Sequence, residues 1–192
     1  MKKTKFILLS LLCILIIIFL LCSNEGFKEY IMSNINNKKY AIHEELPNYH
    51  NVPDKLANIE QFIRTFINYL NNNFPENARV HRLNKRLKSI KLEESELKEG
   101  VSSFTVNKGE LISVCVRDKD DNSQFHNHQL LLFVIIHELA HIASSSFGHN
   151  DEFNTNFKWL LHEAQNVGYT PIDYSINPVT YCGVNVTNNP IM

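Results

Sequence analysis

The sequence predicts an α+β domain, in which a small antiparallel or mixed sheet packs on a long apolar helix, with one transmembrane helix ahead of it. Three observations support this prediction. An uncharged apolar run stands near the N-terminus, segments of alternating character occupy the middle of the chain, and segments of helical period flank them. The chain has 192 residues, so the part of it beyond the apolar run has the length of one domain.

The N-terminal segment, residues 1–23, is interpreted as an uncleaved signal anchor. Phe6–Cys22 is uncharged, and as a helix it would span roughly 25 Å, near the lower limit for a bilayer. The residues after it offer no good cleavage site, which disfavours a cleaved signal peptide. A buried core helix is a further alternative. Three lysines precede the run, so the N-terminus is expected in the cytosol and the domain in a lumenal or extracytosolic compartment. The sequence thus predicts a single-pass membrane protein.

Charge argues against a nucleic-acid partner. The chain has a net charge of −1, and residues 23–192 carry 16 basic and 20 acidic residues, net −4. A nucleic-acid binder is basic overall or carries a strongly basic stripe. The basic run over residues 79–91 is followed at once by four glutamates, so a solvated face is the preferred interpretation.

Residues 24–53 are polar and rich in asparagine, and we expect them to form a linker. The domain then occupies residues 54–192. It opens with an amphipathic helix, because apolar residues recur at positions i, i+3, i+4 and i+7 from Leu56 to Leu70. A run of asparagines from Asn71 is the expected stop.

Strand-like segments come after the helix. Ile90 and Leu92 alternate with charged residues. Ser103–Val106 and Leu111–Val116 flank a turn that contains Gly109, so these two segments are expected to form a hairpin.

A long apolar helix over residues 127–145 carries the candidate site. His137 and His141 are four residues apart, so both imidazoles lie on one helix face and can share one metal ion. Glu138 is rotated about 100° from His137, beside the open position. Zinc with three protein ligands lowers the pKa of a bound water toward about 7, and Glu138 can then act as acid and base. A core helix with hydrogen-bonded histidines is the alternative.

The third ligand is expected to be His149, because Gly148 lets the chain turn back after His141. Glu163 is the alternative, on a second amphipathic helix over residues 151–167, as in a thermolysin-like arrangement. Other residues left open are Asp151, Glu152, His126, His128 and His162.

The tail from Tyr169 contains three prolines and is expected to be mostly irregular. Tyr169, Tyr174 or Tyr181 could donate a hydrogen bond to an oxyanion, with a packed tyrosine as the alternative. Cys115 and Cys182 could form a disulfide in an extracytosolic compartment, and are otherwise buried thiols.

At the metal helix the chain resembles the WLM and SprT-like metallopeptidases, including members found in large DNA viruses. The shared pattern is residues 137–141, His-Glu-Leu-Ala-His, then a short loop and residues 148–153, Gly-His-Asn-Asp-Glu-Phe. The resemblance covers roughly residues 85–185. It implies a minimal zincin-like fold, zinc, metal ligands at His137, His141 and His149, and Glu138 as the catalytic acid and base.

The expected function is that of a membrane-anchored zinc metalloendopeptidase, which hydrolyses a protein or peptide substrate through a zinc-activated water. One alternative is a DNA–protein crosslink protease, since better-known members of the family cleave such crosslinks. The acidic domain and the apolar segment speak against that role. A non-catalytic zinc-stabilised binding module is another alternative, and the intact Glu138 speaks against it.

Overall fold

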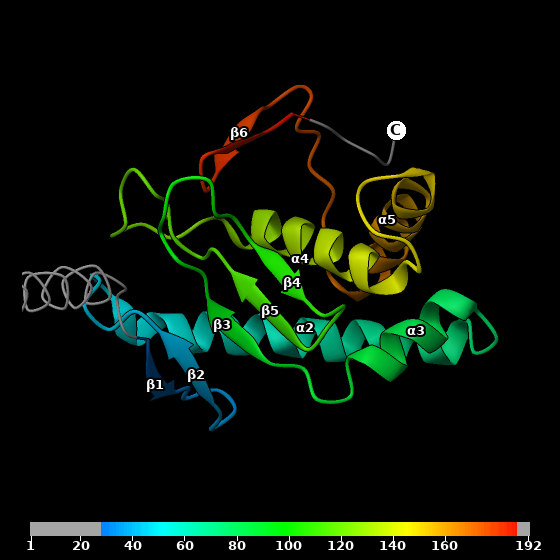
Figure 1. The fold of residues 1–192 in the computed structure, drawn as a ribbon, viewed down its shortest axis with the longest axis horizontal. Coiled ribbons are helices and arrows are strands. Elements are labelled where there is room, and N and C mark those ends of the chain that lie inside the picture. The colour runs from blue at the N-terminus through cyan, green and yellow to red at the C-terminus, as the bar shows by residue number, and fades with distance from the viewer. Residues whose placement is uncertain (1–27, 188–192) are drawn as a thin grey trace, which may run out of the picture.

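A computed structural model describes residues 28–187 of the chain (Figure 1). The predicted combination of helices with a mixed sheet is confirmed. In chain order the elements are β1 (Glu29–Met32), β2 (Lys39–Ile42), η1 (Tyr49–Asn51), α2 (Val52–Asn73), α3 (Ala78–Arg86), β3 (Leu92–Glu94), β4 (Phe104–Val106), β5 (Leu111–Val114), α4 (His128–Ala143), α5 (Asp151–Ala164), η2 (Gln165–Val167), β6 (Val179–Tyr181) and β7 (Val184–Val186).

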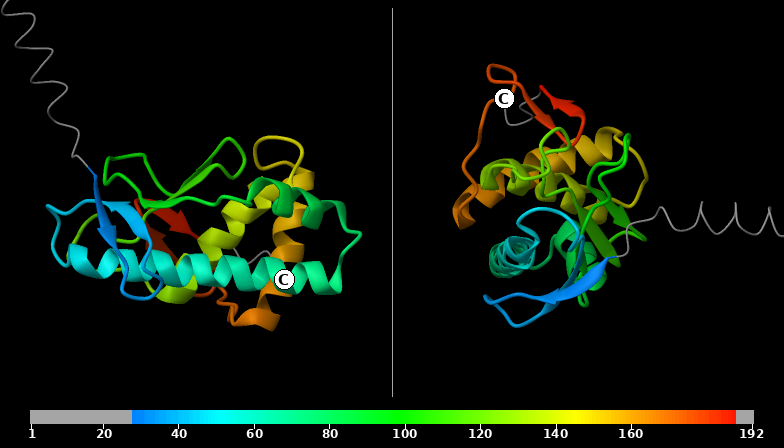
Figure 2. Two further views of the ribbon diagram at one scale, coloured as in Figure 1. Left: turned by 90° about the horizontal axis from the view of Figure 1, so that it is seen from below. Right: turned by 90° about the vertical axis from the view of Figure 1, so that its left-hand side faces the viewer.

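The main sheet has five strands in the order β1-β2-β3-β5-β4. The central strand β3 is parallel to β2 and to β5, while β1 and β4 are antiparallel to their neighbours. The predicted hairpin is present, with Phe104 opposite Ser113 and Val106 opposite Leu111. Its strand β4 is an edge of the sheet, and α2 and α4 lie on the same side of that sheet (Figure 2).

Part of the segment expected to be a linker is structured. Within residues 24–53, β1 and β2 form a hairpin at the other edge of the sheet. Tyr40 and Ile42 are buried, and Asp54 accepts hydrogen bonds from the Ser33 hydroxyl and the Asn34 N–H. Two four-residue strands joined by mostly polar residues contain too few apolar positions to show a period in the sequence.

A buried ion pair fastens two loops to the sheet. Arg117 Nε lies 2.6 Å from Glu94 Oε1, and both side chains are at most 1% exposed. Arg117 also donates to the carbonyl oxygens of Pro47 and Asn122. A buried charge is tolerated when it is paired and hydrogen-bonded in this way.

The helices contradict the prediction of a single-pass membrane protein. Among residues 28–187, none of the helices combines the length and the apolar character needed to cross a membrane. α2 has 22 residues but carries charged side chains such as Glu60 and Arg64. α4 is apolar, but its 16 residues span only about 24 Å, short of a bilayer core of roughly 30 Å. The apolar run Phe6–Cys22, which carried the prediction, lies outside the described residues.

Candidate metal centre

The candidate centre lies on α4, a helix of the interior. Its side chains are apolar on nearly all sides, which is typical of a buried helix. The Asn127 side chain caps it by accepting a hydrogen bond from the Gln129 N–H. His137 and His141 are partly buried on one face, with ring centroids 4.9 Å apart.

His149 reaches the same place from the loop between α4 and α5. Gly148 turns the chain there with a left-handed backbone, φ 80°. His149 Nε2 lies 3.1 Å from His137 Nε2 and 3.1 Å from His141 Nε2. The structure therefore brings together the three histidines that the sequence indicated, and they form a group that could hold a metal ion.

The three imidazoles suit zinc in spacing, and those of His137 and His141 also suit it in protonation. Zn–N bonds of about 2.0–2.1 Å at tetrahedral angles would separate the nitrogens by roughly 3.3 Å. The two distances of 3.1 Å are close to that value. Burial, and then the neighbouring histidines, lower the pKa of His137 to about 3, and burial followed by His149 lowers the pKa of His141 to about 4. Both rings are thus neutral at pH 7, the form that binds metal.

α5 supplies an apolar wall to the centre. The Phe153 ring centroid lies 4.8, 4.3 and 4.7 Å from those of His137, His141 and His149. Phe157 packs against His137 at 5.2 Å. These contacts limit rotation of the imidazoles and exclude water from one side of the centre.

Glu152 holds the loop that carries His149. Its Oε1 accepts hydrogen bonds from the N–H and hydroxyl of Ser145, at 2.9 and 2.7 Å. Its Oε2 accepts from the N–H and hydroxyl of Ser146, at 2.9 and 2.5 Å. These bonds hold the pKa of Glu152 well below its usual range. Glu152 therefore shapes the loop and does not join the histidines, while Asp151 is exposed beside it.

Glu138 is buried beside the histidines, at 4% exposure. Its Oε2 accepts a hydrogen bond of 2.8 Å from the Thr105 hydroxyl on β4. Burial raises the pKa of Glu138 to about 7, against the opposing effect of the Thr105 bond. Glu138 and Thr105 line a cleft of about 660 Å³ together with the three histidines. A carboxyl group that titrates near neutral pH suits general acid–base chemistry.

Three cations cap the C-terminal end of α4. Arg82, Arg86 and Lys108 donate hydrogen bonds to carbonyl oxygens within residues 141–146. Such cations satisfy carbonyls that have no helical partner and oppose the negative end of the helix dipole. Two of them come from α3, so part of the basic run over residues 79–91 supports the C-terminal end of α4 and is not merely solvated.

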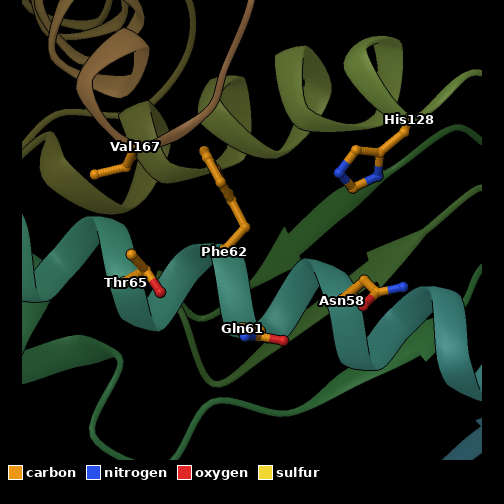
Figure 3. A pocket seen from close by; sticks show the side chains of 6 residues that line it. All are labelled: Asn58, Gln61, Phe62, Thr65, His128 and Val167. Carbon is orange, nitrogen blue, oxygen red and sulfur yellow. The ribbon is translucent and has the colours of Figure 1, made fainter. Parts of the chain in front are cut away.

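The other candidate ligands lie elsewhere. Glu163 accepts a hydrogen bond of 3.0 Å from the Tyr69 hydroxyl, and its other oxygen lies 3.3 Å from the exposed His162. His128 lines a separate hollow, where α2 faces α4 and Val167 (Figure 3). That hollow contains one imidazole and no carboxylate or thiol, which is not a metal-ligand set.

The tail, expected to be mostly irregular, contains a hairpin fixed by a disulfide. β6 and β7 pair across a turn in which Cys182 and Gly183 adopt positive φ. Cys182 is bonded to Cys115, which follows β5, with Cα atoms 6.4 Å apart. His126 is buried here, with Nε2 3.3 Å from Cys182 Sγ, and so does not reach the three histidines.

The three candidate tyrosines are all buried, and none of them lines the cleft. Tyr181 comes nearest, because its hydroxyl lies 2.5 Å from that of Ser103, a residue of the cleft wall. Burial raises the pKa of Tyr181 above its usual range. The packed tyrosine is therefore the interpretation that fits, rather than the oxyanion donor.

Comparison with known proteins gives a family match and viral relatives. The WLM domain model matches residues 80–184, which is more than half of the chain. An uncharacterised protein of Acanthamoeba polyphaga mimivirus is 31% identical over 183 residues, covering 93% of this chain and 92% of that protein. An uncharacterised protein of Invertebrate iridescent virus 6 is 37% identical over 76 residues, 39% of this chain and 42% of that protein. One of Invertebrate iridescent virus 3 is 38% identical over 71 residues, 37% and 43% of the two chains.

Two solved structures also align with the chain. They are the crystal structures of Wss1 and of a Wss1 mutant from Saccharomyces cerevisiae, with TM-scores of 0.46 and 0.42 at 16% identity. Each alignment covers 66% of this chain, and it covers 86% and 87% of the two Wss1 chains.

Proposed function

We propose that this chain, which belongs to the WLM family of metallopeptidases, is a zinc metalloendopeptidase that hydrolyses peptide bonds in a protein or peptide substrate. His137, His141 and His149 hold the zinc ion, and Glu138 is the catalytic acid and base. One observation carries the proposal. Three imidazole nitrogens meet beside a buried carboxyl group, and all four side chains line one cleft.

The chemistry divides between the ion and the chain. Zinc, when bound, supplies a Lewis acid and lowers the pKa of a water molecule to about 7. Glu138 accepts the proton as water attacks the peptide carbonyl, and it then delivers that proton to the leaving amine. Thr105 holds Oε2 of Glu138, so the other carboxylate oxygen is the one available to the proton.

The test uses the full chain with two matched carboxylate-to-amide variants. Glu138→Gln is expected to keep zinc, measured by elemental mass spectrometry, and to cleave a fluorogenic peptide library about 100- to 10,000-fold more slowly. Glu163→Gln removes the same charge on the neighbouring helix and is expected to keep both zinc and activity. His149→Ala is expected to lose zinc. Undiminished cleavage by Glu138→Gln, or zinc lost from Glu163→Gln but kept by His149→Ala, would contradict the assignment.

A zinc-stabilised binding module would use the same histidines without catalysis. It gives no reason for Glu138 in its buried position, because an ionised carboxylate is costly there. Zinc-loaded wild-type protein that cleaves no member of the library would support the binding module. A DNA–protein crosslink protease would instead show cleavage stimulated by DNA.

A further inference from the structure

A positively charged groove adjoins the catalytic cleft. Its volume is about 370 Å³. Its lining consists of Lys85, Arg86, Lys88, Ser89, Lys91, Asn107, Lys108 and Glu110. Asn107 and Lys108 line the cleft as well, so groove and cleft meet at the turn between β4 and β5. Five cations and one carboxylate thus line a single groove, in a chain whose net charge is −1.

Three of these cations are available to a ligand. Arg86 and Lys108 already donate to carbonyl oxygens at the end of α4. Lys85, Lys88 and Lys91 are exposed, and within residues 28–187 they form no ion pair. Neighbouring ammonium groups repel one another, so an anionic ligand would relieve a repulsion that the fold itself leaves in place.

The rim between groove and cleft is suited to a polypeptide. Phe147 is 83% exposed and Phe104 is 42% exposed, and both line the cleft. Lys108 Nζ lies 4.3 Å above the Phe147 ring, so this lysine joins the apolar rim to the basic groove. Exposed rings beside a reactive centre mark a contact for apolar side chains.

We propose that the basic groove binds an acidic stretch of the substrate polypeptide, rich in Asp or Glu, a few residues away from the scissile bond. This rests on the proposed peptidase function and adds the substrate class. The occupant of the groove belongs to the same molecule as the scissile bond, because the two hollows share a wall. A long phosphate polymer fits less well, since residues 23–192 carry net −4 and would repel it outside the groove.

The test compares two double variants of equal charge. Lys88→Gln/Lys91→Gln removes two groove lysines, and Lys39→Gln/Lys158→Gln removes two exposed lysines on β2 and α5. The fluorogenic peptides share one cleavable core and differ only in a flank of Glu or of Gln. At low salt the groove variant is expected to lose about two- to thirtyfold in kcat/KM for the Glu peptide, from two surface ion pairs. Its value for the Gln peptide, and both values of the control variant, are expected to stay unchanged.

The outcomes separate the two proposals. Equal kcat/KM of wild-type protein for the Glu and Gln peptides overturns the acidic substrate and leaves the peptidase intact. Failure to cleave any peptide overturns the peptidase. The groove is then tested without turnover, by fluorescence anisotropy of labelled Glu and Gln peptides on the Glu138→Gln protein. Preference for the Glu peptide, lost in the groove variant, supports the proposal. Tighter binding of an oligonucleotide of equal charge overturns it.

Discussion

Glu152→Gln tests whether the loop, and not only the three imidazoles, sets the affinity for zinc. The carboxylate accepts four hydrogen bonds, two on each oxygen. Glutamine keeps one acceptor oxygen and places an NH₂ group where the other stood, so two of the four bonds are lost. A hydrogen bond to a charged group contributes about 1.5–3 kcal/mol, which gives about 3–6 kcal/mol for two. The side chain is 32% exposed, so solvent screening favours the lower end.

Part of that loss appears in metal binding, because a loosened loop must be reordered when His149 engages the ion. Residues that orient metal ligands typically contribute about 10- to 100-fold to the affinity for the metal. The dissociation constant for zinc is therefore expected to rise by about that factor, measured by competition with a chromophoric chelator on the full chain. Asp151→Asn is the matched control, since it removes a neighbouring exposed carboxylate. A dissociation constant equal to those of wild type and Asp151→Asn would refute the reasoning.

The stabilisation that the Glu152 carboxylate gives to the loop is expected to depend on pH. The Ser145 and Ser146 donors lower the pKa of Glu152, so the folded state favours the ionised form. The stabilisation by the Glu152 hydrogen bonds is complete above the pKa of a glutamate in the unfolded chain, about 4.3, and is lost progressively as pH falls below that value toward the lowered pKa of the folded state. Urea unfolding of metal-free protein between pH 7 and pH 3 is expected to show a smaller loss of stability in Glu152→Gln than in wild type. Equal losses would mean that this carboxylate does not clamp the loop.

Three further predictions concern the catalytic carboxylate, the tail and the interior. Thr105→Val is expected to lower kcat about tenfold, because Glu138 loses the hydrogen bond that orients it. KM and zinc content are expected to stay unchanged, and Thr105→Ser is expected to restore kcat. A change in KM alone would contradict this role. Cys182→Ser opens a loop of sequence separation 67, so the free energy of unfolding in urea is expected to fall by about 4 kcal/mol. An unchanged free energy of unfolding would mean that the bridge is not formed. Arg117→Met leaves Glu94 buried without its partner and is expected to lower the free energy of unfolding by about 3–5 kcal/mol. Much of this loss is expected to be recovered when Glu94→Met is added. No recovery would show that the loss of stability has another source.

The features that the sequence could predict are local. Residues four apart lie on the same face of any helix, so the pattern alone was enough to predict that the imidazoles of His137 and His141 lie side by side. The long amphipathic helix and the β4–β5 hairpin were likewise encoded within short windows. His149 needed only one turn of the chain at Gly148.

The features that the sequence could not predict depend on pairing between distant segments. The Thr105 hydroxyl meets Glu138 across 33 residues, and Arg86 meets the Ser144 carbonyl across 58. Neither partner is visible in a window of one helix or strand. The sequence did not predict helix α3, because this helix is strongly charged and buries only Val80 and Leu83. The strands β1, β2, β6 and β7 are three or four residues long, too short for a period to emerge.

The bridge between Cys115 and Cys182 also determines how a cut chain would behave. The loop that it closes contains α4, α5 and the three histidines, so the candidate metal centre lies inside one covalent ring. A single nick within the ring, for example beside the exposed Phe147, would leave both fragments joined. Without a reductant such a molecule would keep its mass on electrophoresis apart from one added water. Self-cleavage at this loop would therefore become visible only after the disulfide is reduced.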